Sequence, residues 1–518
     1  MTYGYDASTN GKTRLTSVTA TLGTQSYVTT YGGYDSLGRV AASSQAGPGA
    51  TYSFAYAYNL AGQMELETFP SGRRVRSCYD SAGRISVVSN KDTNPAYATV
   101  DASAGYAAHG AVRKLTLGNN VVEATLFDSA DGTVENNTRL QPTHKTIANG
   151  SGVSLLGLKY GYCSSGSTGC ATNNGDVMSQ TIIPSPTVTF SQTYSYDLLD
   201  RLMTATEDGA NGWSEGYGYK WTNKYTWSRT GSLPAMASAT TIQASGAINS
   251  ANQVVGWDYD ADGNLKDYGL SGGVTVGPKM IYDAENHMVS STPTSGTASA
   301  YVYDGMGHRV AAVTPDQTSS TATIAATFVY NAMGEMVVEN SSSSVGVTAG
   351  TTYLSDDTLG STRLVTDALG VPTGRYDYLP FGEEIWAQAN GRSAIAGYSG
   401  AAVRMKFTGK ERDAETGLDY FGARYFSSAQ GRFTGPDAHG FTRRTLKNPQ
   451  KWNKYAYVLN NPLGYIDPNG LEELKITVRT YIPYQTTTMF GTYNGGTKTN
   501  TELRVDPTYR QITSAQFD

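Results

Sequence analysis

Cysteine and histidine are scarce in this sequence. The 518 residues include only Cys78, Cys163 and Cys170, which are too few and too irregularly spaced for a disulfide framework or a four-ligand zinc site. A bridge between Cys163 and Cys170 across the flexible Ser/Gly stretch remains open. The 5 histidines show no metal-ligand spacing such as H-E-x-x-H, and no Walker-type phosphate loop occurs. We therefore expect no metal, nucleotide or other cofactor.

Long apolar runs and concentrated positive charge are also missing. No stretch approaches the roughly 18 apolar residues that span a membrane, so no membrane-spanning segment is expected. A net charge of −5 without a Lys/Arg stripe gives no basis for nucleic-acid binding. The N-terminus lacks the basic and apolar regions of a signal peptide and opens inside a repeat. We expect the natural protein to extend upstream, and any secretion or surface display to depend on that part.

Glycine and tyrosine are abundant. The chain contains 58 Gly and 37 Tyr, and only 16% of its residues are charged. This balance is typical of many short strands joined by turns, and it does not favour long amphipathic helices. An all-β fold is therefore predicted.

One pattern returns along the chain, Tyr-Asp-x-x-Gly-Arg followed by an aliphatic residue. It is nearly intact from Tyr34 to Val40 and from Tyr79 to Ile85. Where copies are consecutive, their tyrosines lie 21 to 27 positions apart, which is the length of a hairpin and its connection. Variants begin at Tyr58, Phe127, Tyr196, Tyr259, Tyr282, Tyr303 and Tyr330.

Each copy predicts a β-hairpin. The aromatic residue ends a strand, Asp or Asn opens an Asx turn, Gly takes the positive φ, and the aliphatic residue starts the return strand. One hairpin cannot bury its face alone, so we predict a spiral array of hairpins that forms a hollow β shell. A β-propeller is the competing architecture, but its repeat is about 40–45 residues with a Trp-Asp signature absent here. Tyrosine recurs at the hairpin position, which favours packing over sugar stacking.

More specific motifs follow toward the C-terminus. In chain order they are Leu359–Arg363, Tyr378–Gly382, Phe407–Glu411, Ala423–Phe426, Gly431–Phe433, Tyr455–Pro462 and Tyr465–Leu471. Together with the repeats, this series resembles the Rhs/YD-repeat family, which includes polymorphic bacterial toxins, the C component of insecticidal toxin complexes and the animal teneurins. The resemblance covers about residues 1–471. It implies a Rhs core-associated segment that closes the shell and cuts its own chain.

The resemblance implies three parts. Residues 1–350 would form the repeat shell, incomplete at its N-terminus, and residues 351–471 the closing plug and autoprotease. Residues 472–518 would be the truncated start of a variable effector, in which we predict a strand over residues 476–488 and see no catalytic pair.

Two weaker stretches interrupt the repeats, at residues 134–181 and 228–251. They are rich in Ser, Thr, Ala, Gly and Asn. Their low charge and plentiful Thr and Val argue against disordered linkers, so we expect strands and long loops of the same wall.

Asp437 and Asp467 are the candidate catalytic residues. Two carboxylates in a water-poor site cannot both ionise cheaply, so one keeps its proton as an acid while the other activates water. The two lie 30 positions apart beside Pro or Gly, where residue type alone favours a structural Asx role. The resemblance implies instead an aspartyl autoprotease that cuts between Leu471 and Glu472.

The resemblance adds an arginine, and the sequence departs from the family at two points. Arg424, 13 residues before Asp437, occupies the position of the family's catalytic Arg. A guanidinium there would lower the pKa of one carboxylate and hold the scissile carbonyl or its oxyanion; a salt bridge within the plug is the alternative role, and Arg432 is the rival residue. Ala438 stands where the family has Pro, and an insertion around Phe441–Lys447 lengthens the spacer before the second Asp.

Three function classes follow. The favoured one is the shell of a bacterial toxin that encloses its own C-terminal effector and releases it by self-cleavage. The resemblance implies a secretion-system spike or a toxin-complex component, and an immunity protein, as partners. The alternatives are a cell-surface adhesion or carbohydrate-binding protein, and an inert scaffold without cleavage.

Removal of divalent metals should leave any self-cleavage unchanged, because the sequence contains no ligand cluster. The test compares fragment yields of the purified chain with and without EDTA. Cleavage that stops with EDTA and returns with added Zn²⁺ would contradict this prediction.

Overall fold

The computed structural model describes most of the chain. The described residues are 1–22, 25–93, 96–127, 140–163, 173–209, 212–218, 226–231, 248–271, 274–275, 277–294, 298–314, 323–341, 350–385, 391–398, 403–438, 440, 446–471, 474–475, 484–493 and 496–504. Nearly all regular structure among them is strand, and the helices with defined bounds are short 3-10 turns. The predicted all-β class is therefore confirmed.

The first sheet is an 18-stranded antiparallel meander in which each strand pairs with the next. Its strands are β1 (Thr2–Tyr5), β2 (Leu15–Leu22), β3 (Gln25–Tyr34), β4 (Val40–Gly47), β5 (Ala50–Tyr58), β6 (Met64–Thr68), β7 (Arg74–Tyr79), β8 (Ile85–Asn90), β9 (Ala96–Val100), β10 (Lys114–Leu117), β11 (Val122–Phe127), β12 (Pro142–Ala148), β13 (Ser154–Gly161), β14 (Ser179–Ser185), β15 (Val188–Tyr196), β16 (Leu202–Glu207), β17 (Trp213–Gly218) and β18 (Thr226–Gly231). The described parts of the two weaker stretches contribute strands to this wall, including β12 and β13.

The second large sheet has 11 strands. They are β23 (Lys279–Tyr282), β24 (Met288–Thr292), β25 (Ser299–Tyr303), β26 (Arg309–Thr314), β27 (Thr323–Tyr330), β28 (Met336–Ser341), β29 (Gly350–Asp356), β30 (Thr362–Thr366), β31 (Pro372–Arg375), β40 (Tyr484–Tyr493) and β41 (Gly496–Arg504). The hairpin β40–β41 lies between β28 and β29 and pairs with both. The strand predicted over residues 476–488 overlaps β40 from Tyr484 onward, and residues 476–483 lie outside the described part.

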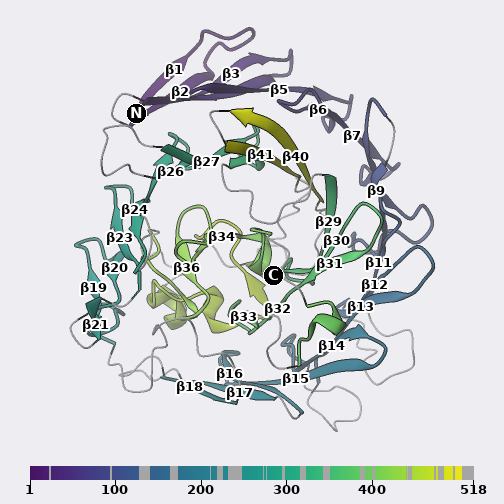
Figure 1. Ribbon diagram of the computed structural model, residues 1–518, viewed down its shortest axis with the longest axis vertical. Helices are drawn as coiled ribbons and strands as arrows, with labels where there is room; N and C mark the ends of the chain where they lie inside the picture. The colour runs from purple at the N-terminus through teal and green to yellow at the C-terminus, as the bar shows by residue number, and fades with distance from the viewer. Residues whose placement is uncertain are drawn as a thin grey trace.

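Smaller elements complete the chain. The short strands are β19 (Asp258–Tyr259), β20 (Leu265–Asp267), β21 (Leu270–Ser271), β22 (Val274–Thr275), β32 (Asp377–Tyr378), β33 (Glu384–Ile385), β34 (Glu411–Arg412), β35 (Asp419–Tyr420), β36 (Tyr425–Ser427), β37 (Arg432–Phe433), β38 (Tyr465–Ile466) and β39 (Leu474–Lys475). The 3-10 turns are η1 (Ala394–Ala396), η2 (Phe407–Gly409), η3 (Pro449–Trp452) and η4 (Val458–Asn460). Figure 1 shows the first sheet and β19 to β24 around the periphery, β29 to β31 and the β40–β41 hairpin inside this ring, and β32, β33, β34 and β36 toward the middle.

The repeat forms a hairpin tip that is fixed by its own side chains. The Asp35 carboxylate accepts from the backbone N–H groups of Leu37 and Arg39, both at 2.9 Å, and from the Arg39 side chain at 2.6 Å. The Arg39 guanidinium lies 4.4 Å from the ring centroid of Tyr58, in the next copy. The Tyr58 hydroxyl donates back to the carbonyl of Val40 at 2.9 Å. This copy is thereby fastened to its neighbour, and Tyr58 packs between the two hairpin tips.

Histidine replaces arginine in the later copies. His287 stacks on Tyr303 and His308 stacks on Tyr330, each with ring centroids 4.5 Å apart. The Tyr303 hydroxyl donates to the carbonyl of Met288 at 2.9 Å, as in the earlier copies. These histidines are therefore structural members of the repeat.

The inner segment, defined as the described part of residues 403–471, has an aromatic core. Its central rings have centroids 4.5 to 6.1 Å apart, and each of their residues is at most 2% exposed. They belong to Phe407, Phe421, Phe426, Phe433 and Tyr457. This core builds the support for the candidate site described below.

Buried ion pairs join the inner segment to the wall. Arg309 of β26 is 1% exposed and donates to both oxygens of Asp413, at 2.7 and 2.9 Å, and to Glu411 at 2.8 Å. Arg404 bridges Glu411 at 2.8 Å and Glu339 of β28 at 3.0 Å. Breaking such a buried pair leaves an uncompensated charge, so these contacts specify how the inner segment sits against the wall.

A second buried cluster repeats this arrangement at another part of the wall. Arg392, which is fully buried, binds Glu207 of β16 at 2.5 Å and Asp377 at 2.9 Å, and Arg363 binds Asp377 at 2.6 Å. Composition gave no indication of either cluster, because the sequence does not distinguish these buried charged residues from those at the surface.

The cysteines differ in state. Cys163 forms a disulfide, as a bridge between Cys163 and Cys170 would require, and Cys78 is free. Cys170 lies outside the described residues.

The shell should lose stability as pH rises from about 4 to about 7. Burial is the main reason why the pKa of Asp413 and that of Glu339 are both raised to about 7, whereas in an unfolded chain both are about 4. The folded chain therefore binds these protons more tightly, and this contribution to the free energy of unfolding is complete below pH about 4 and lost by about pH 7.

The variant Glu339→Gln, a neutral mimic of the protonated group, should flatten this slope in unfolding midpoints measured from pH 5 to 8. Glu65→Gln is the control, since the Glu65–Arg76 pair is exposed. Equal slopes in wild type and Glu339→Gln would contradict the prediction.

Candidate functional site

Arg424 is the centre of the candidate site. It lies at the start of β36, is 9% exposed, and its guanidinium carbon stands 3.7 Å from the ring centroid of Phe433. One nitrogen is 3.4 Å from the Asp467 carboxylate, another donates to the Lys454 carbonyl at 3.0 Å, and Nε donates to the carbonyl of Gly470. The guanidinium thus binds a carboxylate and two backbone carbonyls at once.

Asp467 folds the chain just before the predicted cut. It lies in the loop between β38 and β39, which pair with each other, and it is 3% exposed. Its Oδ1 accepts from the backbone N–H groups of Gly470 at 2.7 Å, Leu471 at 3.1 Å and Asn469 at 3.3 Å. We call residues 467–471 the cleavage loop.

The pKa of Asp467 is raised above its ordinary value. Burial is the largest cause, and it outweighs the opposing effects of the Arg424 charge, the Gly470 N–H and the Lys410 charge. Desolvation is thus the leading reason why the pKa of Asp467 is raised.

Asp437 approaches the same centre through the backbone. Its N–H donates to the Lys454 carbonyl at 2.9 Å, and this is the oxygen that Arg424 also binds. Asp437 is half-buried, whereas Asp467 is deeply buried. The structure therefore links both predicted aspartates to Arg424, one directly and one through the carbonyl of Lys454.

The described residues at the two departures from the expected pattern, which are Ala438, Leu446 and Lys447, are exposed. The chain resumes regular structure at η3, where the Asn448 side chain accepts from the backbone N–H of Gln450 at 3.1 Å. Of the insertion, residues 441–445 lie outside the described part, as does Glu472 on the far side of the predicted cut.

Arg432, the rival of Arg424, is engaged elsewhere. It donates to the carbonyl of Asn252 at 2.6 Å and lies 4.6 Å from the ring centroid of Tyr455. The contact with Asn252 fastens β37 to the loop before β19. Arg424, which binds the cleavage loop itself, is the stronger candidate.

Lys410 is a site residue to which sequence reasoning gave no role. Its ammonium donates to the carbonyl of Pro468 in the cleavage loop. The signal was present in the motif Phe407–Glu411, which supported the family resemblance, but no chemistry distinguished this lysine from other surface lysines.

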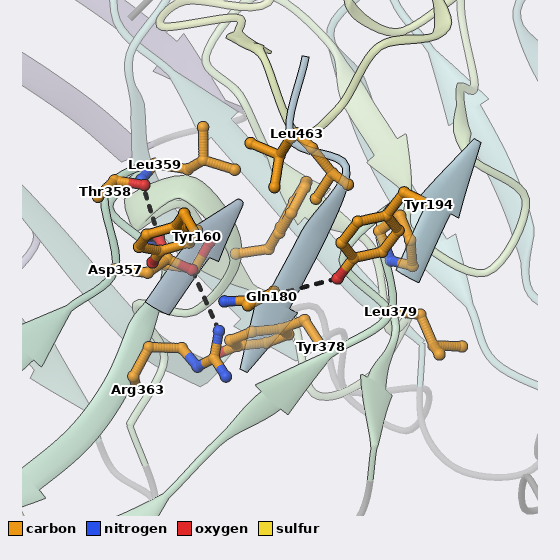
Figure 2. A pocket seen from close by; sticks show the side chains of 14 residues that line it. Tyr160, Gln180, Tyr194, Asp357, Thr358, Leu359, Arg363, Tyr378, Leu379 and Leu463 are labelled. Carbon is orange, nitrogen blue, oxygen red and sulfur yellow. Dashed lines mark hydrogen bonds and ion pairs between the residues drawn. The ribbon is translucent and has the colours of Figure 1, made fainter. Parts of the chain in front are cut away.

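A small cavity lies away from these residues. It measures about 30 Å³ and is bordered by β13, β14, β15 and the turn before β30 (Figure 2). Tyr194 donates to Gln180 at 3.3 Å beside it, and Arg363 pairs with Asp357 at 3.4 Å. This volume admits about one water molecule, which is too little for a sugar ring or a peptide side chain.

Within the described ranges, no group of three or more His, Cys, Asp or Glu side chains is arranged to hold a metal ion. The same residues include no helix long and apolar enough to cross a bilayer.

Known proteins resemble parts of this sequence. The RHS Repeat family matches residues 282–319. Toxin subunit YenC1 of Yersinia entomophaga is 34% identical over 120 residues, which is 23% of this chain and 11% of that protein. Salivary gland surface protein 1 of Aedes aegypti is 34% identical over 111 residues, which is 21% of this chain and 3% of that protein. The chain thus spans a small part of these relatives.

A solved structure resembles almost the whole chain. The crystal structure of TcdB2-TccC3 matches with a TM-score of 0.64 at 18% identity, over 91% of this chain and 27% of that chain. A likeness at this identity establishes the fold. It agrees with the β-hairpin shell predicted from the repeat.

Replacing Gly470 by alanine should disrupt the cleavage loop. Gly470 has φ +78°, and a Cβ there would lie 3.1 Å from the backbone nitrogen of Arg424 and 3.2 Å from the Cβ of Phe421. Gly417 is the matched control, because it has φ +69° but open space around it.

Gly417→Ala should therefore lower the free energy of unfolding by only the strain of a left-handed alanine, about 1–2 kcal/mol. Gly470→Ala should lower it by more and should expose residues 467–471 to limited proteolysis. Thermal unfolding and proteolysis of both variants check this. Equal behaviour would show that the loop tolerates the side chain.

Proposed function

Because this chain belongs to the Rhs/YD-repeat family, we propose that it is the shell of a toxin that encloses a C-terminal effector and releases it by cutting itself after Leu471. The observation that carries the proposal is the triple engagement of Arg424. Its guanidinium binds the Asp467 carboxylate, the carbonyl of Gly470 and the carbonyl that also holds the backbone of Asp437. A merely structural salt bridge would not need the second and third contacts.

The cut would follow aspartic-protease chemistry. Asp467, whose pKa burial raises, would carry the proton and donate it to the leaving nitrogen of Glu472. Asp437, which is more exposed, would take a proton from the water that attacks the carbonyl carbon of Leu471. The products would be a chain ending at Leu471 and a fragment beginning at Glu472.

The arrangement suits an intramolecular reaction. Asp467 lies 4 residues before the scissile bond, and its Oδ1 already holds the N–H of Leu471 at 3.1 Å. A substrate held this way has lost most of its freedom before the reaction, and such positioning accounts for large parts of enzymatic rate enhancements.

The parts of the protein follow from this proposal. Residues 1–350 would form the shell, residues 351–471 the closing and cutting segment, and residues 472–518 the start of the effector. A toxin-complex component or a secretion-system spike, and an immunity protein, would be its partners, and its place of action would be outside the producing cell or at its surface.

A surface adhesion protein is the second candidate. It is favoured by the similarity to a salivary gland surface protein over 111 residues. An adhesin does not need self-cleavage, and neither does an inert scaffold, so one experiment separates the toxin shell from both alternatives.

The purified chain should cleave itself to give a fragment whose N-terminus is Glu472, at a rate independent of protein concentration. Asp437→Asn and Asp467→Asn should abolish that fragment, because each removes a carboxylate that the reaction requires. Mass spectrometry of the fragments distinguishes this cut from spontaneous breakage at Asp467-Pro468 or Asn469-Gly470, which would start fragments at Pro468 or Gly470.

Two outcomes would overturn the proposal. If either Asn variant still yields the Glu472 fragment, the aspartyl mechanism is wrong. If the unmutated chain stays intact, the Ala438 turn and the longer spacer have disabled the site, and the scaffold interpretation replaces the toxin shell.

A further inference from the structure

Lys410 occupies a place in the site that the proposed mechanism does not use. We propose that Lys410 is a positioning residue, which holds the cleavage loop for the cut and makes that position depend on the assembled wall. This inference rests on the proposed self-cleavage and adds a residue to it.

The first step is the contact with the loop. The Lys410 ammonium donates to the carbonyl of Pro468, the residue directly after Asp467. It lies 5.4 Å from the ring centroid of Phe421, whose Cβ stands against Gly470 at the other end of the loop. Arg424 donates a hydrogen bond to the carbonyl of Gly470, and Lys410 donates one to the carbonyl of Pro468. Two cationic donors thus fix both halves of a five-residue segment.

The second step is the connection of Lys410 to the wall. Lys410 follows η2, and its N–H donates to the carbonyl of Phe407 at 3.0 Å. The N–H of Thr408 donates to the Ser361 hydroxyl at 3.0 Å, and Thr362 donates through its N–H to the carbonyl of Lys406 at 3.1 Å. The turn that carries Lys410 is therefore built on the start of β30. A wall without β30 in place would leave Lys410 without its support.

The third step is charge. The positive charges facing Asp467 are those of Arg424 and Lys410, and both oppose the rise of its pKa that burial causes. Removing the Lys410 charge should therefore raise the pKa of Asp467 further. A residue that acted only by packing would leave this pKa unchanged.

The test compares Lys410→Met, which keeps the apolar stem, with Lys410→Arg, which keeps charge and donors. Lys406→Met is the matched control, since the Lys406 side chain lies in the same turn but pairs with Glu384. Lys410→Met should slow cleavage about 10- to 100-fold, as a misplaced substrate does, and move the alkaline limb of the pH–rate profile to higher pH. Lys410→Arg should restore the profile, and Lys406→Met should match wild type.

Dependence on the wall is tested by Ser361→Ala, which removes the acceptor of the Thr408 N–H. It should slow cleavage in the wild-type background and have no further effect in Lys410→Met. An unshifted pH profile in Lys410→Met, or independent effects of the two substitutions, would overturn the inference.

Failure of the proposed function is recognised separately. If wild type and Lys406→Met both stay intact, self-cleavage is absent, and the positioning role is decided by unfolding midpoints of Lys410→Met, Asp467→Asn and the double variant. Non-additive losses support the contact between Lys410 and the loop, and additive losses refute it.

Discussion

The whole structure depends on a cation stacked on a tyrosine of the next repeat. Arg39 on Tyr58 and Arg84 on Tyr106 lie 4.4 and 4.3 Å from the ring centroids, and each of these tyrosine hydroxyls returns a hydrogen bond to the preceding hairpin. A hairpin alone is marginal in water. Because these tips are tied to their neighbours by side chains as well as by the strand ladder, a long array can keep one register and surround an interior.

The local part of this fold could be predicted from sequence, because the turn chemistry is contained in a few adjacent residues. Asp35, Gly38 and Arg39 specify a hairpin wherever they occur in this order. The arrangement of the sheets is not local. Nothing near Arg309 or Glu207 in the sequence indicates that they pair with residues more than 100 positions away. Yet Arg309 joins the wall to the inner segment, and Glu207 joins the wall to Arg392.

The candidate site was predictable to a similar degree. Arg424, Asp437 and Asp467 were named from motifs. In the structure Arg424 donates to the carbonyls of Lys454 and Gly470, the N–H of Asp437 donates to the carbonyl of Lys454, and the Asp467 carboxylate accepts from the N–H of Gly470. Lys410 was missed because its role arises from a turn supported by Ser361, which only the fold brings near. Sequence motifs identify the residues that would carry out the reaction. The residues that position them are found only from the contacts in the folded structure.

Burial of Asp467 also orders events in time. In an unfolded chain this carboxyl has an ordinary pKa, and Arg424 lies 43 positions away in sequence. Three features exist only once the aromatic core of the inner segment has formed. They are the raised pKa of Asp467, the hydrogen bond from Arg424 to the carbonyl of Gly470, and the packing of Arg424 on Phe433. A cut that needs all three cannot precede folding, so in the proposed mechanism the inner segment folds before the chain is severed.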